Sequence, residues 1–288
     1  DDNPGALYCL NGDYVTIKDL NINRNLVNIY LWNTTNITIE DSIANKGGYG
    51  LQIQQCENVT IRNVTSLGNE WRGLESSDSP DVSVENSTIR DLYLVGCDGA
   101  ILRNNTFTDN PDLDASNDET QGVFITESHD TIVIGNSISY NRAVGLDFSN
   151  SDGIIAENHI FDNRGAGILS YGGEYNGEVI ISNNLIENND YGIQLEECDE
   201  NRIENNSILN SEYAGLSIST DYQNIFVNNY LSNYQNIEVI SENPQITWNV
   251  DPTPGPNIVG GPSIGGNYWG SPDKSGFSDT AEDSDGDG

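Results

Sequence analysis

The chain has 288 residues, enough for one large core or two modest domains, and its 11 Lys and Arg against 45 Asp and Glu give a formal net charge of −34. A surface this acidic repels nucleic acid and anionic lipid, and no apolar run approaches the ~18 to 20 residues needed to cross a bilayer. We therefore exclude nucleic-acid partners and a membrane span, and expect cations such as Ca²⁺ as partners.

The chain starts at Asp1, contains no Met and has no signal peptide, so we expect a processed chain or a fragment of a larger surface protein.

The sequence contains a strong internal repeat. Residues 50–63 and 192–205 share one pattern: a glycine, a four-residue alternating strand, a polar turn, a second short strand and a closing asparagine.

The closing Asn or Asp recurs with a spacing near 22 residues, which is too short for a βαβ unit and too rich in strands for a helical repeat. This spacing predicts an all-β fold: a single-stranded right-handed parallel β-helix of about eleven coils over residues 1–250, followed by a cap at 251–288. We place the closing residue at Asp19, Asp41, Asn63, Asn86, Asn104, Asn136, Asn158, Asn183, Asn205, Asn228 and Asn249.

Alternating apolar residues should point inward and stack on their equivalents one coil away; Leu51, Ile53, Val59 and Ile61 are examples. The closing column should form a buried ladder of side-chain amides. A second ladder is expected at Asn69, Asn110, Asn141, Asn163, Asn188, Asn210 and Asn233.

The four cysteines are expected to be free thiols. Cys56, Cys97 and Cys198 take the same position in coils that are at least ~10 Å apart, beyond the ~7 Å between Cα atoms that a disulfide spans. Cys9 aligns with Ile53 and should face the core.

The end of the chain departs from the repeat. A Pro-rich exit at 251–256 precedes Gly265-Gly-Asn-Tyr-Trp-Gly270 and an acidic tail. Asp283, Asp285 and Asp287, followed by a glycine, match the first ligands of an EF-hand-like loop, so we predict a weak Ca²⁺ site there.

With these features the repeats at 28–249 resemble those of NosD-type proteins and the related carbohydrate-binding and sugar-hydrolase domains. The closing motif and acidic tail are similar to the ends of such modules in surface proteins of methanogenic archaea. NosD-type proteins are commonly labelled copper-binding, but copper favours Met, Cys and His ligands, and this chain has no Met, dispersed cysteines and two separated histidines, His129 and His159. We therefore predict no copper.

The resemblance implies that a substrate would lie along one outward sheet face. On this face aromatic rings are interleaved with amides and carboxylates, which suits a sugar polymer, although aromatic residues also favour strands for structural reasons. The predicted glycan-binding residues are Tyr30, Trp32, Gln52, Gln54, Glu75, Tyr93, Phe124, Asp147, Tyr171, Gln194 and Glu196.

The spacing of the carboxylates argues against catalysis. Glu75 and Asp147 should be three coils (~14 Å) apart, and Asp147 and Glu196 more than ~10 Å apart, whereas glycosidase pairs lie at ~5 Å or ~6.5 to 9.5 Å. No basic residue is expected beside Asp147. An inserted acidic loop at 111–120 offers an alternative: Asp114 and Asp118 would join Asp147 as a catalytic or metal site, or the loop is simply solvated.

Seven Asn-X-Ser/Thr sequons suggest a secreted glycoprotein. Asn33, Asn36 and Asn58 should lie at turns where a glycan fits. The other four, at Asn63, Asn86, Asn104 and Asn205, should be buried in the ladder.

Two hypotheses remain open. The first is a secreted or cell-surface module without catalytic activity, a structural spacer that binds a glycan. The alternative is a polysaccharide lyase or glycoside hydrolase that uses the 111–120 loop and Asp147. End-to-end self-association into filaments is a further expectation, because no cap is evident for the first coil.

Overall fold

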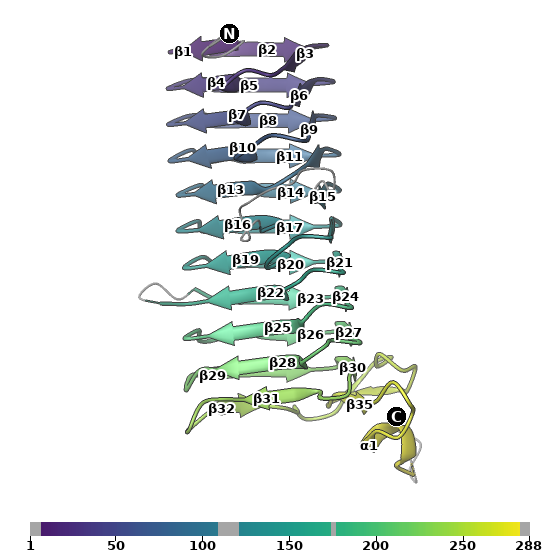
Figure 1. Cartoon of the computed structure of the whole chain (residues 1–288). Coiled ribbons are helices and arrows are strands. Elements are labelled where there is room, and N and C mark those ends of the chain that lie inside the picture. Colours follow the sequence, from purple (N-terminus) through teal and green to yellow (C-terminus); the bar gives the residue numbers. More distant parts are fainter. Residues whose placement is uncertain (1–6, 109–120, 174–176, 283–288) are drawn as a thin grey trace.

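The computed structural model describes residues 7–108, 121–173 and 177–282. The chain winds into a right-handed solenoid of stacked coils, whose strands align as long parallel sheets (Figure 1). Three of these sheets have eleven strands each, and from β1 to β30 the chain visits them in strict rotation. The predicted all-β parallel β-helix is confirmed. No helix in the described part of the chain is long and apolar enough to cross a bilayer.

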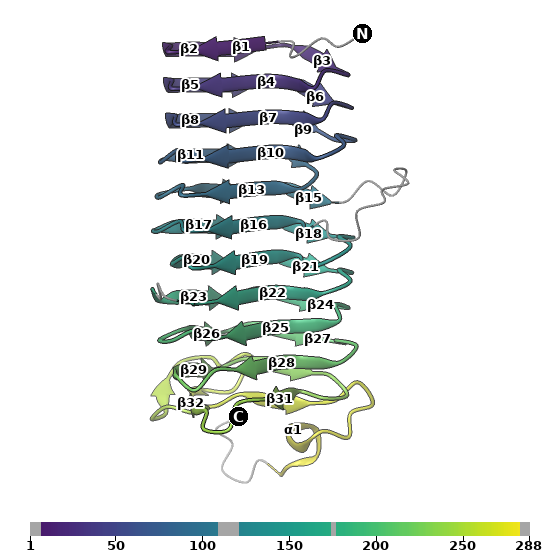
Figure 2. The ribbon, with the colours of Figure 1, turned by 60° about the vertical axis from the view of Figure 1, so that its left-hand side comes forward.

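The first sheet, sheet A, runs along the side seen in the centre of Figure 2. Its strands are β1 (Leu7–Leu10), β4 (Val27–Trp32), β7 (Tyr49–Gln54), β10 (Arg72–Ser77), β13 (Leu92–Val95), β16 (Val123–Thr126), β19 (Leu146–Ser149), β22 (Ala166–Tyr171), β25 (Tyr191–Glu196), β28 (Ala214–Ser219) and β31 (Ile237–Val239).

The second sheet, sheet B, follows sheet A within each coil. Its strands are β2 (Asp13–Lys18), β5 (Thr35–Glu40), β8 (Glu57–Arg62), β11 (Val82–Glu85), β14 (Ile101–Arg103), β17 (Thr131–Ile134), β20 (Gly153–Ala156), β23 (Val179–Ser182), β26 (Arg202–Glu204), β29 (Gln223–Val227) and β32 (Gln245–Thr247).

The third sheet, sheet C, has the shortest strands. They are β3 (Asn21–Asn23), β6 (Ile43–Asn45), β9 (Thr65–Ser66), β12 (Thr88–Ile89), β15 (Thr106–Thr108), β18 (Ser137–Ser139), β21 (His159–Phe161), β24 (Leu185–Glu187), β27 (Ser207–Leu209), β30 (Tyr230–Ser232) and β35 (Tyr268–Gly270).

The core is a column of aliphatic side chains inside the three sheets. Leu51, Ile53, Val59 and Ile61 are completely buried, as the alternation predicts. Each stacks in register on an equivalent residue one coil away, for example Leu51 on Leu74. A single coil cannot bury these side chains by itself, so the stacking of neighbouring coils creates the core.

A buried asparagine ladder runs between sheets B and C, but the predicted register was wrong for most of its members. The buried residue is one position after the predicted one, at Asn105, Asn184, Asn206 and Asn229, whereas Asn136 and Asn158 were placed correctly. The full ladder contains Asn105, Asn136, Asn158, Asn184, Asn206, Asn229 and Asn267.

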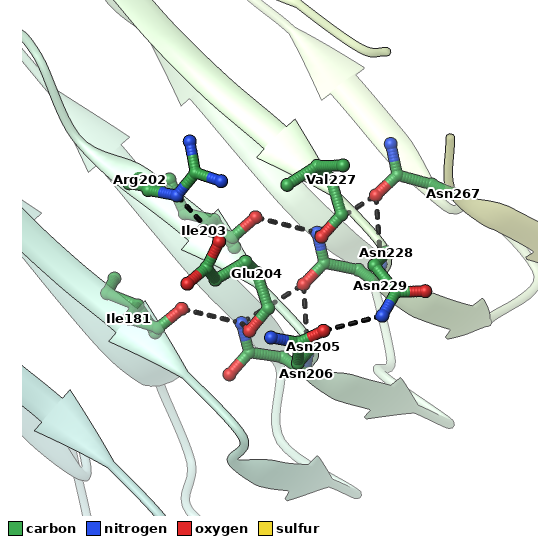
Figure 3. Close-up of polar contacts among 10 residues, drawn as sticks. All are labelled: Ile181, Arg202, Ile203, Glu204, Asn205, Asn206, Val227, Asn228, Asn229 and Asn267. Carbon is green, nitrogen blue, oxygen red and sulfur yellow. Dashed lines mark hydrogen bonds and ion pairs between the residues drawn. The ribbon is translucent and has the colours of Figure 1, made fainter. Parts of the chain in front are cut away.

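Each amide in this ladder connects three coils. The Oδ1 of Asn158 accepts the backbone N–H of Asn136 at 2.9 Å, and its Nδ2 donates to the carbonyl of Val133 at 2.9 Å and to the Oδ1 of Asn184 at 3.0 Å. Figure 3 shows the same arrangement around Asn206 and Asn229. The turn backbone is therefore hydrogen-bonded without water.

The residue before most ladder positions has a left-handed backbone, and its side chain points outward. Asn104, Asn183 and Asn205 have φ values of 55°, 57° and 57°, in the left-handed region that Asn tolerates better than most residues. Their side chains lie outside the core. The prediction that the sequons at Asn63, Asn86, Asn104 and Asn205 are buried was therefore wrong: the first three are exposed and the last is partly exposed.

The second ladder lies between sheets C and A, and most of its predicted members are confirmed: Asn69, Asn141, Asn163 and Asn233 are buried, and Oδ1 of Asn69, Asn163 and Asn233 accepts a backbone N–H. Asn141, Asn163 and Asn189 are linked by Oδ1 atoms that accept the backbone N–H of the preceding coil, at 3.1 and 3.0 Å. Asn188 and Asn210, which we predicted in the ladder, instead have positive φ and point outward. Asn110 lies outside the described residues.

The four cysteines are free thiols. Cys56, Cys97 and Cys198 are buried at the turn between sheets A and B, where Thr34, Ser79 and Ser128 occupy the equivalent place in other coils. Cys9 is partly buried and packs against the core.

The C-terminal segment returns to the solenoid. Strands β33 (Thr253–Pro254) and β34 (Ser263–Ile264) form a small hairpin, β35 then pairs with β30, and α1 (Phe277–Thr280) packs beside β35. Within the Asn-Tyr-Trp-Gly motif, Asn267 ends the ladder and Trp269 packs against Trp248. This motif therefore covers the last coil.

We predict that Asn158→Ala lowers the free energy of unfolding by about 2–4 kcal/mol, because it leaves the Asn136 N–H and the Val133 carbonyl buried without partners. The control is Asn183→Gly, which keeps the left-handed turn and should cost less than about 1 kcal/mol. Urea denaturation followed by circular dichroism measures both. Equal losses would contradict the role of the ladder.

Candidate functional site

The outward face of sheet A holds all eleven residues that we predicted to bind a glycan. The strand register aligns them in two rows, each with one residue per coil. The first row contains Tyr8, Tyr30, Gln52, Glu75, Tyr93, Phe124, Asp147, Leu169, Gln194, Ser217 and Glu238. The second contains Leu10, Trp32, Gln54, Ser77, Val95, Thr126, Ser149, Tyr171, Glu196 and Ser219.

The N-terminal part of the face presents open aromatic surface. Trp32 is 37% exposed, and the rings of Tyr8 and Tyr30 meet edge to face at 5.6 Å. The Tyr30 hydroxyl donates to Gln54 Oε1 at 2.8 Å. These contacts fix the Tyr30 side chain while leaving Trp32 accessible to a ligand.

The middle of the face is a closed stack. The Tyr93 and Phe124 rings are nearly parallel, with centroids 4.7 Å apart, and the guanidinium of Arg72 lies 4.0 Å from the Tyr93 ring centroid. Both faces of the Tyr93 ring are therefore covered by protein. Our expectation of flat apolar faces for sugar stacking does not hold at Tyr93.

Arg72 is a functional candidate that the sequence pattern missed. It is 2.8 Å from Asp91 and 3.6 Å from Glu75, and Glu75 also accepts a hydrogen bond from Gln52 at 3.1 Å. Strict alternation would put Arg72 on the same side as the buried Leu74. Gly73 interrupts the alternation, since Gly73 and Leu74 are both buried, and Arg72 remains on the outer face.

Asp147 is the most unusual group on the face, because it is outward-pointing yet only 5% exposed. Gln121 Nε2 donates to its Oδ2 at 3.0 Å, and the Ser149 hydroxyl donates to its Oδ1. Burial raises the pKa of Asp147 to about 6, against the lowering effect of these two hydrogen bonds; the charge of Glu196 adds to the rise. A perturbed carboxyl of this kind is typical of functional sites.

The strand register gives the carboxylate spacing that we expected. Glu75 and Asp147 are three coils apart, ~14 Å, and Asp147 and Glu196 are two coils apart and offset by two residues along the strand. Neither pair matches a glycosidase pair. The coils that adjoin Asp147 place Phe124 and Leu169 beside it, while Arg72 lies beside Glu75 at the far end of the ring stack.

Several predicted residues lie outside the described part of the chain. These are the loop candidates Asp114 and Asp118 and the tail candidates Asp283, Asp285 and Asp287. The catalytic and Ca²⁺ assignments at these positions stay predictions.

Of the three predicted glycosylation sites, Asn33 lies at the turn between β4 and β5, as expected, whereas Asn36 and Asn58 lie near the start of β5 and β8, at positions of positive φ. Asn33 and Asn58 are exposed and Asn36 is partly exposed. Their amides form an outer ladder, in which Asn33 donates to Asn11 at 2.6 Å and Asn58 donates to Asn36 at 2.7 Å. A glycan on Asn33 or Asn58 would take the place of one of the two hydrogens of the amide nitrogen that makes these bonds.

The described donor atoms do not fit a copper site. His129 pairs with Asp152 at 2.7 Å at the turn before sheet B, whereas His159 pairs with Glu187 at 2.8 Å on sheet C. Among the described residues no three His, Cys, Asp or Glu side chains are grouped as metal ligands, and the chain has no Met. Copper prefers the Met, Cys and His donors that are missing from any such group.

The sheets and the open outward face define a parallel β-helix protein. Family comparison then places the chain more closely: the family described as periplasmic copper-binding protein (NosD) matches residues 1–163 and 98–274. The chain therefore belongs to the NosD family. No curated protein matches it.

Three solved structures are similar. A mutant of the periplasmic alginate epimerase AlgG has a TM-score of 0.61 and 15% identity, over 82% of this chain and 73% of that one. PfbA, a surface adhesin of Streptococcus pneumoniae, has a TM-score of 0.54 and 14% identity, over 86% of this chain and 77% of that one. A mutant tailspike of the E. coli bacteriophage HK620, in complex with a hexasaccharide, has a TM-score of 0.56 and 12% identity, over 82% of this chain and 53% of that one. At these identities the likeness concerns the fold alone.

We predict that Asp147→Asn stabilises the protein at pH 7.5 but not at pH 4. The folded-state pKa of about 6 is above the ordinary 3.8, so the native state binds the extra proton and stability falls as pH rises between these values. The gain at pH 7.5 should be on the order of 1–3 kcal/mol in urea denaturation. Glu196→Gln, a partly exposed carboxylate on the same face, should leave most of the pH dependence intact. The same pH dependence in Asp147→Asn would contradict this assignment.

Proposed function

We propose that the protein is a secreted or cell-surface module that binds a carbohydrate polymer along the outward face of sheet A without cleaving it. The observation behind this proposal is the in-register face itself, on which polar and aromatic side chains follow one another from β1 to β31. Eleven strands at ~4.8 Å give a surface about 50 Å long, which suits a chain ligand better than a small molecule.

The charge of the face favours a neutral glycan. Its two rows contain four carboxylates, Glu75, Asp147, Glu196 and Glu238, and no Lys or Arg. Arg72, which lies over Tyr93 on the same face, is already paired with Asp91 and Glu75, and the whole chain has a net charge of −34. An acidic polysaccharide would be repelled unless a cation such as Ca²⁺ bridged it to the protein. Amides at Gln52 and Gln194 offer neutral donors and acceptors for sugar hydroxyls.

The similar structures support the general class of function proposed, a carbohydrate-related β-helix protein. These structures are a surface adhesin, a periplasmic alginate epimerase and a phage tailspike in complex with a hexasaccharide. The family is described as periplasmic.

A catalytic role is the second candidate, and Asp147 is the observation that favours it. Its raised pKa of about 6 suits a general acid near neutral pH. The second acid would come from Asp114 or Asp118 in the 111–120 loop. Turnover of a polysaccharide by the wild type, abolished by Asp147→Asn, would support a lyase or hydrolase in place of the binding module.

A glycan array, screened with and without Ca²⁺, tests the binding proposal. We expect saturable binding to one polysaccharide class, reduced about tenfold by Trp32→Ala, because the variant loses the apolar ring surface on which a sugar stacks, and a tenfold loss corresponds to about 1.4 kcal/mol. Tyr171→Ala should also weaken binding. Tyr140→Ala removes an exposed ring that contacts Phe161 of sheet C and serves as the control.

An array without any signal under both conditions would contradict the proposal. An equal loss in Tyr140→Ala would also contradict it, because binding would then not depend on sheet A. Loss of binding only when Ca²⁺ is removed would support a cation-bridged glycan on the same face.

A further inference from the structure

The outward face of sheet B contains a stripe of isoleucines. Ile101, Ile132, Ile154 and Ile180 lie next to one another on four successive coils. Their chain neighbours on the C-terminal side, such as Val133 and Ile155, are completely buried, so alternation along the strand directs the stripe away from the core.

The second outward row widens this stripe with Ile134, whose neighbour in register, Ala156, is buried. The patch is uncovered in the described structure: Ile154 is 39% exposed, and Ile101, Ile132, Ile134 and Ile180 are partly exposed. Parallel sheets usually have both faces covered, and an apolar patch rimmed by polar residues marks an interaction site.

Charged residues border the patch at both ends. At the N-terminal end of the patch, Arg103 lies two residues after Ile101 on the same strand, β14, and it makes no ion pair with the described residues. Arg202 and Glu204 lie on the C-terminal side, bonded to each other at 2.6 Å (Figure 3). The two outward rows of sheet B contain four cations, Lys18, Arg62, Arg103 and Arg202, against the three carboxylates Glu40, Glu85 and Glu204.

We propose that this face docks a second copy of the chain in an antiparallel, two-fold symmetric pair. Two copies with a net charge of −34 repel each other over most of their surfaces, so they can approach best through a nearly neutral face. Because a two-fold interface is self-complementary, the same patch must serve both partners.

The register indicates where the axis lies. A two-fold axis along β20 brings Ile154 onto Ile154 of the partner subunit and Ile132 onto Ile180 of the partner subunit. It also sets Arg103 opposite Glu204 of the partner subunit, two coils from the axis on either side. The same axis places Arg202 on Ile101 of the partner subunit, but Arg202 keeps its bond to Glu204 of its own chain at 2.6 Å. In a parallel pair it is Arg103, which has no ion pair among the described residues, that would lie on Ile101 of the partner subunit.

The size of the patch sets the expected strength. Its apolar part extends over four coils, about 20 Å with the side chains, and is about 10 Å wide, so its area of about 200 Å² is well below the ~800 Å² per partner of a standard interface. The flanking charged rows must therefore be buried as well, and we expect a reversible dimer in the micromolar range rather than a permanent one.

Sedimentation velocity of the full chain, from about 1 to 200 µM, tests this proposal. We expect a monomer–dimer equilibrium in which Ile154→Asp weakens association at least about tenfold. Ile43→Asp is the matched control: Ile43 is 38% exposed on sheet C, and its substitution should leave association unchanged. Circular dichroism of each variant checks that the solenoid is intact.

A charge exchange tests the orientation without changing the apolar patch. Arg103→Glu alone and Glu204→Arg alone should each weaken the dimer, and the double variant should restore it. A chain that stays monomeric up to the highest concentration, or a dimer that Ile154→Asp leaves intact, would overturn the proposal. A double variant that dimerises more weakly than either single variant would overturn the antiparallel arrangement. Because none of these residues lies on sheet A, glycan binding can succeed or fail independently.

Discussion

The structure depends on the side-chain amides that hydrogen-bond from one coil to the next inside the turns. Each ladder Asn satisfies a buried backbone N–H of the coil before it, so a shift of one residue would leave several polar groups unpaired at once. The ladders therefore fix the register of the strands that flank them. The outward rows of sheets A and B are a direct consequence, because in-register strands place equivalent positions in line.

The outward faces of sheets A and B differ in charge. The two rows of sheet A contain carboxylates without Lys or Arg, and those of sheet B contain nearly balanced charges and the isoleucine stripe. An acidic, hydrogen-bonding surface suits a hydrated, neutral glycan, whereas a neutral apolar surface suits protein contact. If both proposals hold, dimerisation through sheet B would leave both copies of sheet A free, and the pair would offer two glycan-binding faces.

Much of the fold could be predicted from the sequence, because the period of 22 residues and the alternation at Leu51 and Ile53 follow directly from stacked strands. The ladder register was harder to assign. In pairs such as Asn183-Asn184 and Asn205-Asn206 both residues are Asn, and only backbone conformation separates the outward, left-handed residue from the buried one. The stacking of Arg72 on Tyr93 was likewise unpredictable, since it depends on the broken alternation at Gly73. The burial of Asp147 also requires tertiary contacts, including the hydrogen bond from Gln121.

The central claim is that sheet A binds an extended carbohydrate chain along the solenoid axis. The most direct test is calorimetric titration with a length series of one oligosaccharide, from disaccharide to decasaccharide, taken from the polysaccharide class that binds best. An extended site on successive coils predicts affinity that increases with chain length until the ligand spans the face. Equal affinity for the disaccharide and the decasaccharide would contradict this claim and indicate a single local pocket.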